Sequence, residues 1–236
     1  MIAVFTYKRP VQQIYNFTVN QKHWIQKAIA AAKDVGYETC LYTDDQDFAQ
    51  GLNLDELHFI SDEYNIWDSF KLYVLQNRTS SDYFLCDNDC IFHKYIEFED
   101  DVDIYFDGIE NGIYETTYFK TIKKLHLNGI INLSQLKQSG TVNVGILKIN
   151  NTQVKETYIE KWKAIYSKVK SSISEYPILG LTATLTQGIL SNIVLNSKYS
   201  YKYFTNSVEF KDWSKGNEYY THYVGKNKVA KPNELI

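Results

Sequence analysis

The chain has 236 residues with a formal net charge of −3, and 44% of its residues are hydrophobic. This length and apolar content suffice for one large domain with a sizeable core, and the small net charge gives no sign of nucleic-acid binding. No run of about 20 apolar residues is present, so no membrane span is predicted, and the N-terminus lacks a signal-peptide pattern. The three cysteines favour reduced thiols and a cytoplasmic location.

The first part of the sequence alternates apolar runs with stretches of helical periodicity. Near-continuous apolar runs predict buried strands over Ile2–Tyr7, Glu38–Thr43 and Leu57–Ser61. Apolar residues that recur every three or four positions predict helices over Asn20–Val35 and Ile66–Gln76. Because strands and helices alternate, we expect βαβ units with right-handed crossovers and a mostly parallel sheet.

The rest of the sequence is less regular. Its residues 110–138 hold scattered aromatic and basic side chains, and an irregular surface loop is the interpretation that this pattern favours. The other predicted elements are strands over Tyr83–Cys86, Val102–Phe106, Gly140–Asn150, Tyr199–Phe204 and Glu218–Val224, and helices over Val154–Val169 and Leu181–Leu195.

The sequence Asp87-Asn88-Asp89 directly follows one of these strands. Residues two apart in an extended chain point the same way, so Asp87 and Asp89 can face one point. Two converging carboxylates repel each other unless a cation or a proton lies between them. Their oxygen atoms suit Mg²⁺ or Mn²⁺, which often complete their coordination with phosphate oxygens of a substrate. The alternative is a polar turn after a core strand.

Three segments together resemble motifs of the GT-A glycosyltransferases, in particular the family 8-like members. The strand that ends in Asp87-Asn88-Asp89 resembles the metal-binding Asp-x-Asp motif of that family. The strand around Asn143 and Gly145 resembles its Asn-x-Gly strand. Near the C-terminus, His222, Gly225 and Lys228 have the spacing of its His-x-x-Gly-x-x-Lys motif.

The resemblance implies a fold, a reaction and a cofactor. The implied fold is α/β of the GT-A (Rossmann-like) type, with a mixed, mostly parallel sheet flanked by helices. It forms a single domain over 1–236, with the nucleotide-binding part at about 1–107 and the acceptor side at about 108–236. The implied activity is that of a hexosyltransferase that moves a sugar, with retention, from a nucleotide-diphosphate sugar (UDP-sugar first) to an acceptor that the sequence does not identify. The implied cofactor is Mn²⁺ or Mg²⁺.

The resemblance also implies roles for individual residues. It makes Asp87, Asp89 and His222 the metal ligands, and it places Gln187 and Asn143 at the reacting centre as catalytic residues. Asn143 can bond a sugar hydroxyl through its amide, and Gly145 lets the backbone approach closely. Contacts to the nucleotide sugar are implied for Thr6, Tyr7, Asp44, Lys71, Asp87, Asn143, Gly145, Gly225 and Lys228.

Some features leave other interpretations open. Thr186 precedes Gln187 where the family has Asp, which keeps open a non-catalytic nucleotide-sugar-binding protein of the same fold. A strand followed by Asp-x-Asp also resembles the haloacid dehalogenase nucleophile motif, so an Asp-x-Asp phosphohydrolase is a further alternative. Lys71 is equally consistent with an exposed helix lysine. The tail that carries His222 is polar, and we expect it to become ordered only with metal and donor.

Overall fold

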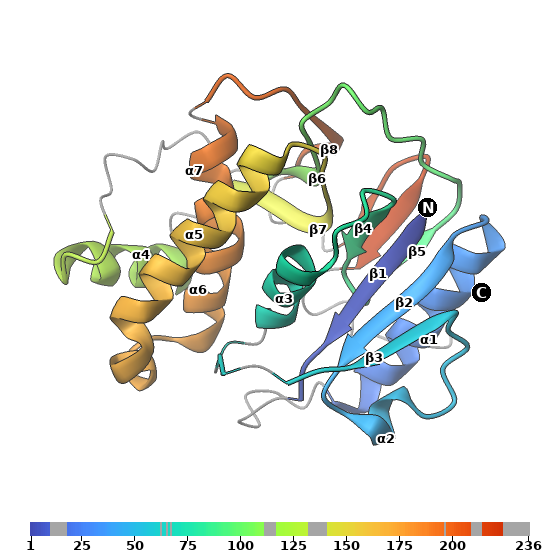
Figure 1. Ribbon diagram of the computed structural model, residues 1–236, viewed down its shortest axis with the longest axis horizontal. Helices are drawn as coiled ribbons and strands as arrows, with labels where there is room; N and C mark the ends of the chain where they lie inside the picture. The colour runs from blue at the N-terminus through green and yellow to red at the C-terminus, as the bar shows by residue number, and fades with distance from the viewer. Residues whose placement is uncertain are drawn as a thin grey trace.

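In the computed structural model, a seven-stranded sheet has helices on both faces and a three-stranded sheet beside it (Figure 1). The structure describes residues 1–9, 18–61, 63–64, 66, 68–110, 117–131, 141–195, 197–208 and 214–223. The strands are β1 (Ile2–Tyr7), β2 (Glu38–Thr43), β3 (Glu56–Phe59), β4 (Tyr83–Cys86), β5 (Cys90–Phe92), β6 (Ile104–Glu110), β7 (Thr141–Ile149), β8 (Tyr201–Val208), β9 (Ser214–Gly216) and β10 (Tyr220–Tyr223). The helices are α1 (Thr18–Asp34), α2 (Gln46–Ala49), α3 (Ser69–Asn77), α4 (Thr117–Leu127), α5 (Thr152–Val169), η3 (Lys170–Glu175), α6 (Ile178–Ala183), η4 (Thr184–Gly188) and α7 (Ile189–Leu195).

The large sheet has the strand order β3-β2-β1-β4-β7-β6-β8. Strands β1 and β2 pair in parallel, as do β1 and β4, β2 and β3, and β6 and β8. Strand β7 runs antiparallel to both of its neighbours, β4 and β6. The predicted α/β class with a mixed, mostly parallel sheet is therefore confirmed. The first, second and fourth strands lie in one sheet and end at the same edge, because Tyr7 pairs with Thr43 and Phe5 with Cys86.

Both faces of the sheet are buried, which explains the near-continuous apolar runs in its strands. Along β1, Val4 belongs to one hydrophobic cluster, and its neighbours Ala3 and Phe5 belong to the other. Helices α3, α5 and α7 supply apolar side chains to the first cluster, and α1 supplies them to the second. Figure 1 shows the same division, with α5 and α3 on one side of the strands and α1 on the other. The layers leave the carboxyl ends of β1 and β4 at a common edge.

The predicted elements differ from the structure most clearly in three regions. The region 110–138, expected to be an irregular loop, contains α4, whose Thr121 and Leu125 are buried. Strand β6 does not end before Asp107-Gly108 but continues to Glu110, and Asp107 lies buried within it. The single helix predicted over Leu181–Leu195 is instead α6, a π-helical turn η4 and α7. π-Helical turns are rare and occur often at functional sites.

The small antiparallel sheet, in the order β5-β10-β9, joins the C-terminal part of the chain to the segment after Asp89. Strand β10 pairs with β5 so that His222 lies opposite Cys90. His222 and Tyr220 are buried, so this strand has its own contacts to offset the entropy of ordering it. His222 itself thus lies in a buried strand, while the expectation that ligand orders the tail concerns a segment of which only residues up to Tyr223 are described, and it stays a prediction. Gly225 and Lys228 lie outside the described residues. Within the part that is described, no helix has the length and apolar character to cross a bilayer.

Candidate metal centre

Two carboxylates and one imidazole meet at the carboxyl end of β4. The His222 Nε2 atom lies 3.4 Å from Asp89 Oδ1 and 3.6 Å from Asp87 Oδ2. His222 and Asp89 are each only 3% exposed, whereas the side chain of Asp87 keeps 32% of its surface open to solvent. The structure therefore brings together the three residues that the motifs imply as metal ligands.

Backbone contacts fix the Asp-x-Asp turn. The Asp87 N–H donates to the carbonyl of Gly145 at 2.8 Å, which ties the turn to the antiparallel strand β7. The Cys90 N–H donates to the Asp87 carbonyl, and the Asn88 side chain donates to the carbonyl of Thr6. The turn is thus held from β1 and from β7, and both carboxylates lie on the same side as His222.

The His222 ring is held by a second carboxylate, from β6. Its Nδ1 atom lies 2.7 Å from Asp107 Oδ2, and Asp107 is completely buried. The ring packs over Gly145, where a Cβ atom would lie 2.5 Å from Nδ1. The sequence predicted that a ligand would approach the backbone at Gly145. In the structure it is the imidazole of the same chain that occupies the space beside this glycine.

The surrounding charges favour a cation at this point. Burial lowers the pKa of His222, but Cys90, Asp89 and the hydrogen bond to Asp107 outweigh that effect and hold the pKa well above its ordinary value. A metal ion that binds Nε2 must displace the proton that this environment favours. The proton and the metal ion have the same electrostatic effect, because each places positive charge among the carboxylates.

Lys71 lies in the site rather than on an exposed helix face. It is 5% exposed, and its Nζ atom lies 2.5 Å from Asp87 Oδ1 and 3.6 Å from Asp68 Oδ2. Burial lowers its pKa, but Asp68 and Asp87 outweigh that effect and raise it. Lys71 is therefore a buried ammonium group whose partner is the more open of the two carboxylates in the Asp-x-Asp motif.

The donor atoms fit a divalent ion of the Mg²⁺ or Mn²⁺ type. Asp87 and Asp89 offer hard oxygen atoms and His222 a nitrogen, a set that suits Mn²⁺ in particular. The Cys90 thiol is close enough to be a fourth donor, since its sulfur and ligand atoms of Asp89 and His222 all lie within 4.8 Å of one another. Burial, however, raises the pKa of Cys90 well above its ordinary value, and its Sγ atom contacts the Gly145 carbonyl.

A polar pair borders the site on β6 and β7. Asn143 is 4% exposed; its side-chain amide donates to Glu110, and its Oδ1 accepts from the Gly145 N–H at 2.8 Å. The pair therefore has an amide and a carboxylate side by side, two groups that can bind hydroxyls. Asn143 is buried and bonded to Glu110, and its contact with a sugar stays a prediction.

Gln187 belongs to the π-helical turn η4, which packs against β7. The carbonyl of Gln187 accepts from the Ser191 hydroxyl, and the same hydroxyl accepts from the Val142 N–H, next to Asn143. The Gln187 Oε1 atom is buried with no hydrogen-bond partner among the described residues. Thr186 donates to the carbonyl of Thr182 within its own helix, so its hydroxyl is already engaged.

The residues predicted to contact the nucleotide are placed at the ends of β1 and β2. The Tyr7 ring stacks on Phe48 with centroids 3.4 Å apart, and burial, with Asp45 and Asp44 nearby, raises its pKa to about 12. Asp44 is exposed and accepts from the Arg9 N–H at 2.7 Å. The Thr6 carbonyl receives the Asn88 side chain. These residues share the edge that carries Asp87, but protein groups already contact each of them.

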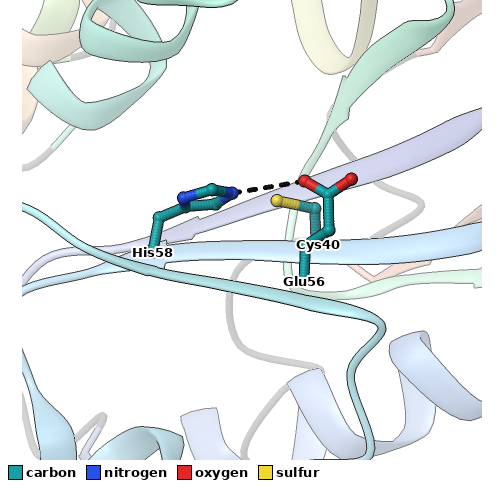
Figure 2. Close-up of side chains that lie close together, drawn as sticks. All are labelled: Cys40, Glu56 and His58. Atoms are coloured by element: carbon teal, nitrogen blue, oxygen red, sulfur yellow. Dashed lines mark hydrogen bonds and ion pairs between the residues drawn. The ribbon is translucent and has the colours of Figure 1, made fainter.

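A second group of side chains of the types that can bind a metal lies on β2 and β3. Its members are Cys40, Glu56 and His58, and Figure 2 shows them pointing toward one another. Two nitrogens of the Arg78 guanidinium lie 3.0 and 3.3 Å from the Glu56 carboxylate, and one of them lies 3.6 Å from Cys40 Sγ. Burial raises the pKa of the Cys40 thiol to about 12. Because a guanidinium already balances the carboxylate, we interpret this group as a structural ion pair.

The sequence matches no protein-family model and no curated protein. Solved structures do match. One is the galactosyltransferase LgtC in complex with donor and acceptor sugar analogues, which is 12% identical to this chain. The match has a TM-score of 0.37 and covers 87% of this chain and 73% of LgtC. The glycosyltransferase GlyE of Streptococcus pneumoniae TIGR4 matches at 15% identity with a TM-score of 0.44, over 88% of this chain and 45% of that one. The chain thus spans less than half the length of GlyE.

The apo form of GlyE matches at 14% identity with a TM-score of 0.42. The matched structures are glycosyltransferases, the class that the sequence motifs resemble. What the site can do follows from its own residues.

Sequence reasoning missed Asp107 and Glu110, the two β6 carboxylates that contact His222 and Asn143. Asp107-Gly108 has the composition of a turn, which led to a strand boundary before it. The residues give no strand signal at this point, because polar and apolar side chains do not alternate over 106–110 and the register of β6 shifts between Phe106 and Gly108.

Proposed function

We propose that this protein is a metal-dependent glycosyltransferase that uses a nucleotide-diphosphate sugar as donor. The observation that supports this most is the convergence of Asp87, Asp89 and His222 at the carboxyl edge of the sheet. In α/β sheets of this kind, ligands bind outside the carboxyl ends of the strands. An oxygen-rich divalent site at that edge suits a diphosphate, whose oxygens complete the coordination of Mg²⁺ or Mn²⁺.

In this proposal Asp87, Asp89 and His222 hold the ion, and a bound ion would stabilise the charge on the leaving diphosphate. Lys71 holds the carboxylate of Asp87 in place and adds positive charge beside it. Gly225 and Lys228, which lie outside the described residues, remain proposed diphosphate contacts from the segment after β10. The nucleoside is proposed to lie along the ends of β1 and β2, near Thr6, Tyr7 and Asp44.

The sugar is proposed to lie over β7. The amide of Asn143 and the carboxylate of Glu110 form a pair that can exchange its internal hydrogen bond for bonds to sugar hydroxyls. Gln187, with a buried oxygen that lacks a partner among the described residues, is the proposed polar group nearest the reacting carbon. We also propose transfer with retention of configuration, and a division of the chain into a donor part at about 1–107 and an acceptor part at about 108–236. His222 and Asn143 would make the second part contribute to donor binding as well.

The test is donor binding with and without metal. Thermal shift would be measured with UDP, GDP and ADP sugars, each with Mn²⁺ or with chelator, followed by calorimetry on the nucleotide that stabilises most. Asp89→Ala and His222→Ala should lose the Mn²⁺-dependent stabilisation. The matched controls are Asp100→Ala, an exposed carboxylate, and His93→Ala, an exposed imidazole that bonds Thr221 next to His222. Equal binding in the site variants and in wild type would contradict the proposed site.

The same preparations separate the alternatives. Release of sugar from the bound nucleotide sugar, by slow hydrolysis or by transfer to an offered acceptor, is expected for a glycosyltransferase. Tight, metal-dependent binding with no release would favour the non-catalytic binding protein that Thr186 keeps open. Hydrolysis of an aryl phosphate, lost in Asp87→Asn, would favour the phosphohydrolase and would overturn the proposal.

A further inference from the structure

Asp107 is the most enclosed charged group at the centre. It is 0% exposed, and both of its oxygens receive hydrogen bonds. Oδ2 receives the His222 ring at 2.7 Å, and Oδ1 receives the Tyr220 hydroxyl at 2.6 Å and the Thr205 hydroxyl at 3.1 Å. An ionised carboxylate is costly to bury unless such donors surround it. A fold that bears this cost beside a candidate metal ligand suggests a reason for Asp107 beyond packing.

The contact with Asp107 distinguishes the two nitrogens of His222. A carboxylate can only accept a hydrogen bond, so the Nδ1 atom that faces Asp107 carries a proton. The other nitrogen, Nε2, is then the one that faces Asp89 and Asp87. Imidazoles that bind metals characteristically donate their second N–H to a carboxylate, which fixes the tautomer and makes the ring a better ligand.

The neighbouring positions maintain this contact. At Gly145 a Cβ atom would lie 2.5 Å from His222 Nδ1 and 3.0 Å from Asp107 Oδ2, so the pair occupies the space that a side chain would take. Tyr220 lies two residues before His222 on β10 and bonds the same carboxylate. Strands β6, β7 and β10 therefore each supply a part of one arrangement that aims a single nitrogen.

We propose that Asp107 is a positioning residue for the divalent-cation site: it holds His222 in the tautomer and orientation in which Nε2 binds the ion. Tyr220 and Thr205 hold Asp107 in turn. This inference rests on the proposed metal site, and it assigns to Asp107 an effect on metal affinity that acts through His222 alone. It therefore makes a prediction about coupling between two residues, one that a general structural role does not make.

The experiment is a titration of the full chain with Mn²⁺ alone, with free Mn²⁺ followed by electron paramagnetic resonance. Asp107→Asn keeps the shape and one acceptor for Nδ1, and it should weaken Mn²⁺ binding about 10-fold; Asp107→Ala, where it folds, should approach 100-fold. Tyr220→Phe removes a different donor to the same carboxylate and should change the affinity less than about 3-fold. Circular dichroism and thermal unfolding would identify the variants that keep the native fold.

A double-mutant cycle decides between positioning and general structure. If Asp107 acts through His222, Asp107→Asn causes no further loss of Mn²⁺ affinity in a chain that already carries His222→Ala. The same loss in both backgrounds, or an unchanged affinity in Asp107→Asn alone, would overturn the positioning role while leaving the metal site in place. A wild-type chain that binds no Mn²⁺ in this titration would overturn the metal site and the positioning role together.

Discussion

Among the described residues, two clusters each combine a cysteine, a histidine and a carboxylate within 4.8 Å, and they differ in their charge balance. At the sheet edge of β2 and β3, Glu56 faces Arg78 and the neighbouring His58. At the end of β4, Asp89 and Asp87 lie around His222, with Asp107 behind the ring. In the first cluster, the Glu56 carboxylate is balanced by the permanent positive charge of Arg78. In the second, three carboxylates and Lys71 surround the imidazole among the described residues.

The comparison shows why donor atoms alone do not define a metal site. In the β2–β3 cluster, the guanidinium satisfies the carboxylate, and an added divalent ion would have to displace it. At the β4 cluster Lys71 is a permanent cation, and it contacts Asp87 and Asp68. The groups around His222 raise its pKa and so favour positive charge on the ring, and a divalent ion can supply positive charge at the same place.

The largest expected difference between the clusters is in Mn²⁺ binding. Asp89→Asn removes a buried ligand and should weaken Mn²⁺ binding by about 100-fold or more, because even changes behind the ligands typically cost 10- to 100-fold. Glu56→Gln, the matched change at the β2–β3 cluster, should leave Mn²⁺ binding unchanged. Paramagnetic resonance titration of both variants measures this, and equal losses would mean that the ion binds elsewhere.

Gly145→Ala should damage the β4 cluster without touching a ligand. The new Cβ would overlap the His222 ring, so the strand or the ring must shift. We expect a loss of about 3 kcal/mol in unfolding free energy, as for overpacking of a buried site, together with weaker Mn²⁺ binding. Gly188→Ala is the control, because its Cβ would meet its nearest neighbour at 3.8 Å. Urea denaturation measures both, and a stable Gly145→Ala with normal Mn²⁺ binding would contradict the packing of His222 on β7.

Arg78→Ala should have the opposite pattern, loss of stability with unchanged Mn²⁺ binding. The side chain is 12% exposed, pairs with Glu56 and lies over the Tyr83 ring. Its removal leaves Glu56 without its main partner, and we expect a cost of about 2 kcal/mol, between the values for exposed and buried pairs. Lys94→Ala, which breaks the exposed pair with Glu218, should leave the denaturation curve unchanged. A change in Mn²⁺ affinity in Arg78→Ala would contradict the separation of the two clusters.

Part of this arrangement could be predicted from the sequence because it depends on local pattern. Strands such as Ile2–Tyr7 are buried on both faces, so their apolar runs identify them, and a polar pair at the end of β4 falls at the edge of the sheet as a consequence. The pairing of β10 with β5 depends on contacts between segments far apart in the chain. The prediction that His222 meets Asp87 and Asp89 came from resemblance to known motifs. The local residue pattern does not indicate that these two segments lie together.

What the sequence could not supply is which groups face one another behind the ligands. Asp107 follows an apolar run and precedes a glycine, and only the continuation of β6 past that point makes it a buried partner of His222. The same holds for Lys71. The sequence pattern predicts that it lies on a helix, but its burial against Asp87 depends on how α3 packs on the sheet.

The smallest predicted effect concerns the pH dependence of the β2–β3 cluster. The hydrogen bond from Arg78 lowers the pKa of Glu56 from about 4.5 to about 2. A carboxylate whose pKa is lower in the folded state stabilises the fold above its unfolded pKa, and this contribution is lost as the pH falls from about 4.5 toward 2. Because about a third of the Glu56 side chain is exposed, we expect a contribution of only about 1 kcal/mol.

Glu56→Gln should therefore be less stable than wild type at pH 7 by that amount, and urea denaturation at a series of pH values should show the difference shrinking toward pH 2. In Glu218→Gln, at an exposed pair that solvent screens, the difference from wild type should be smaller and should change less with pH. A constant difference in Glu56→Gln would mean that Arg78 does not hold the Glu56 carboxylate.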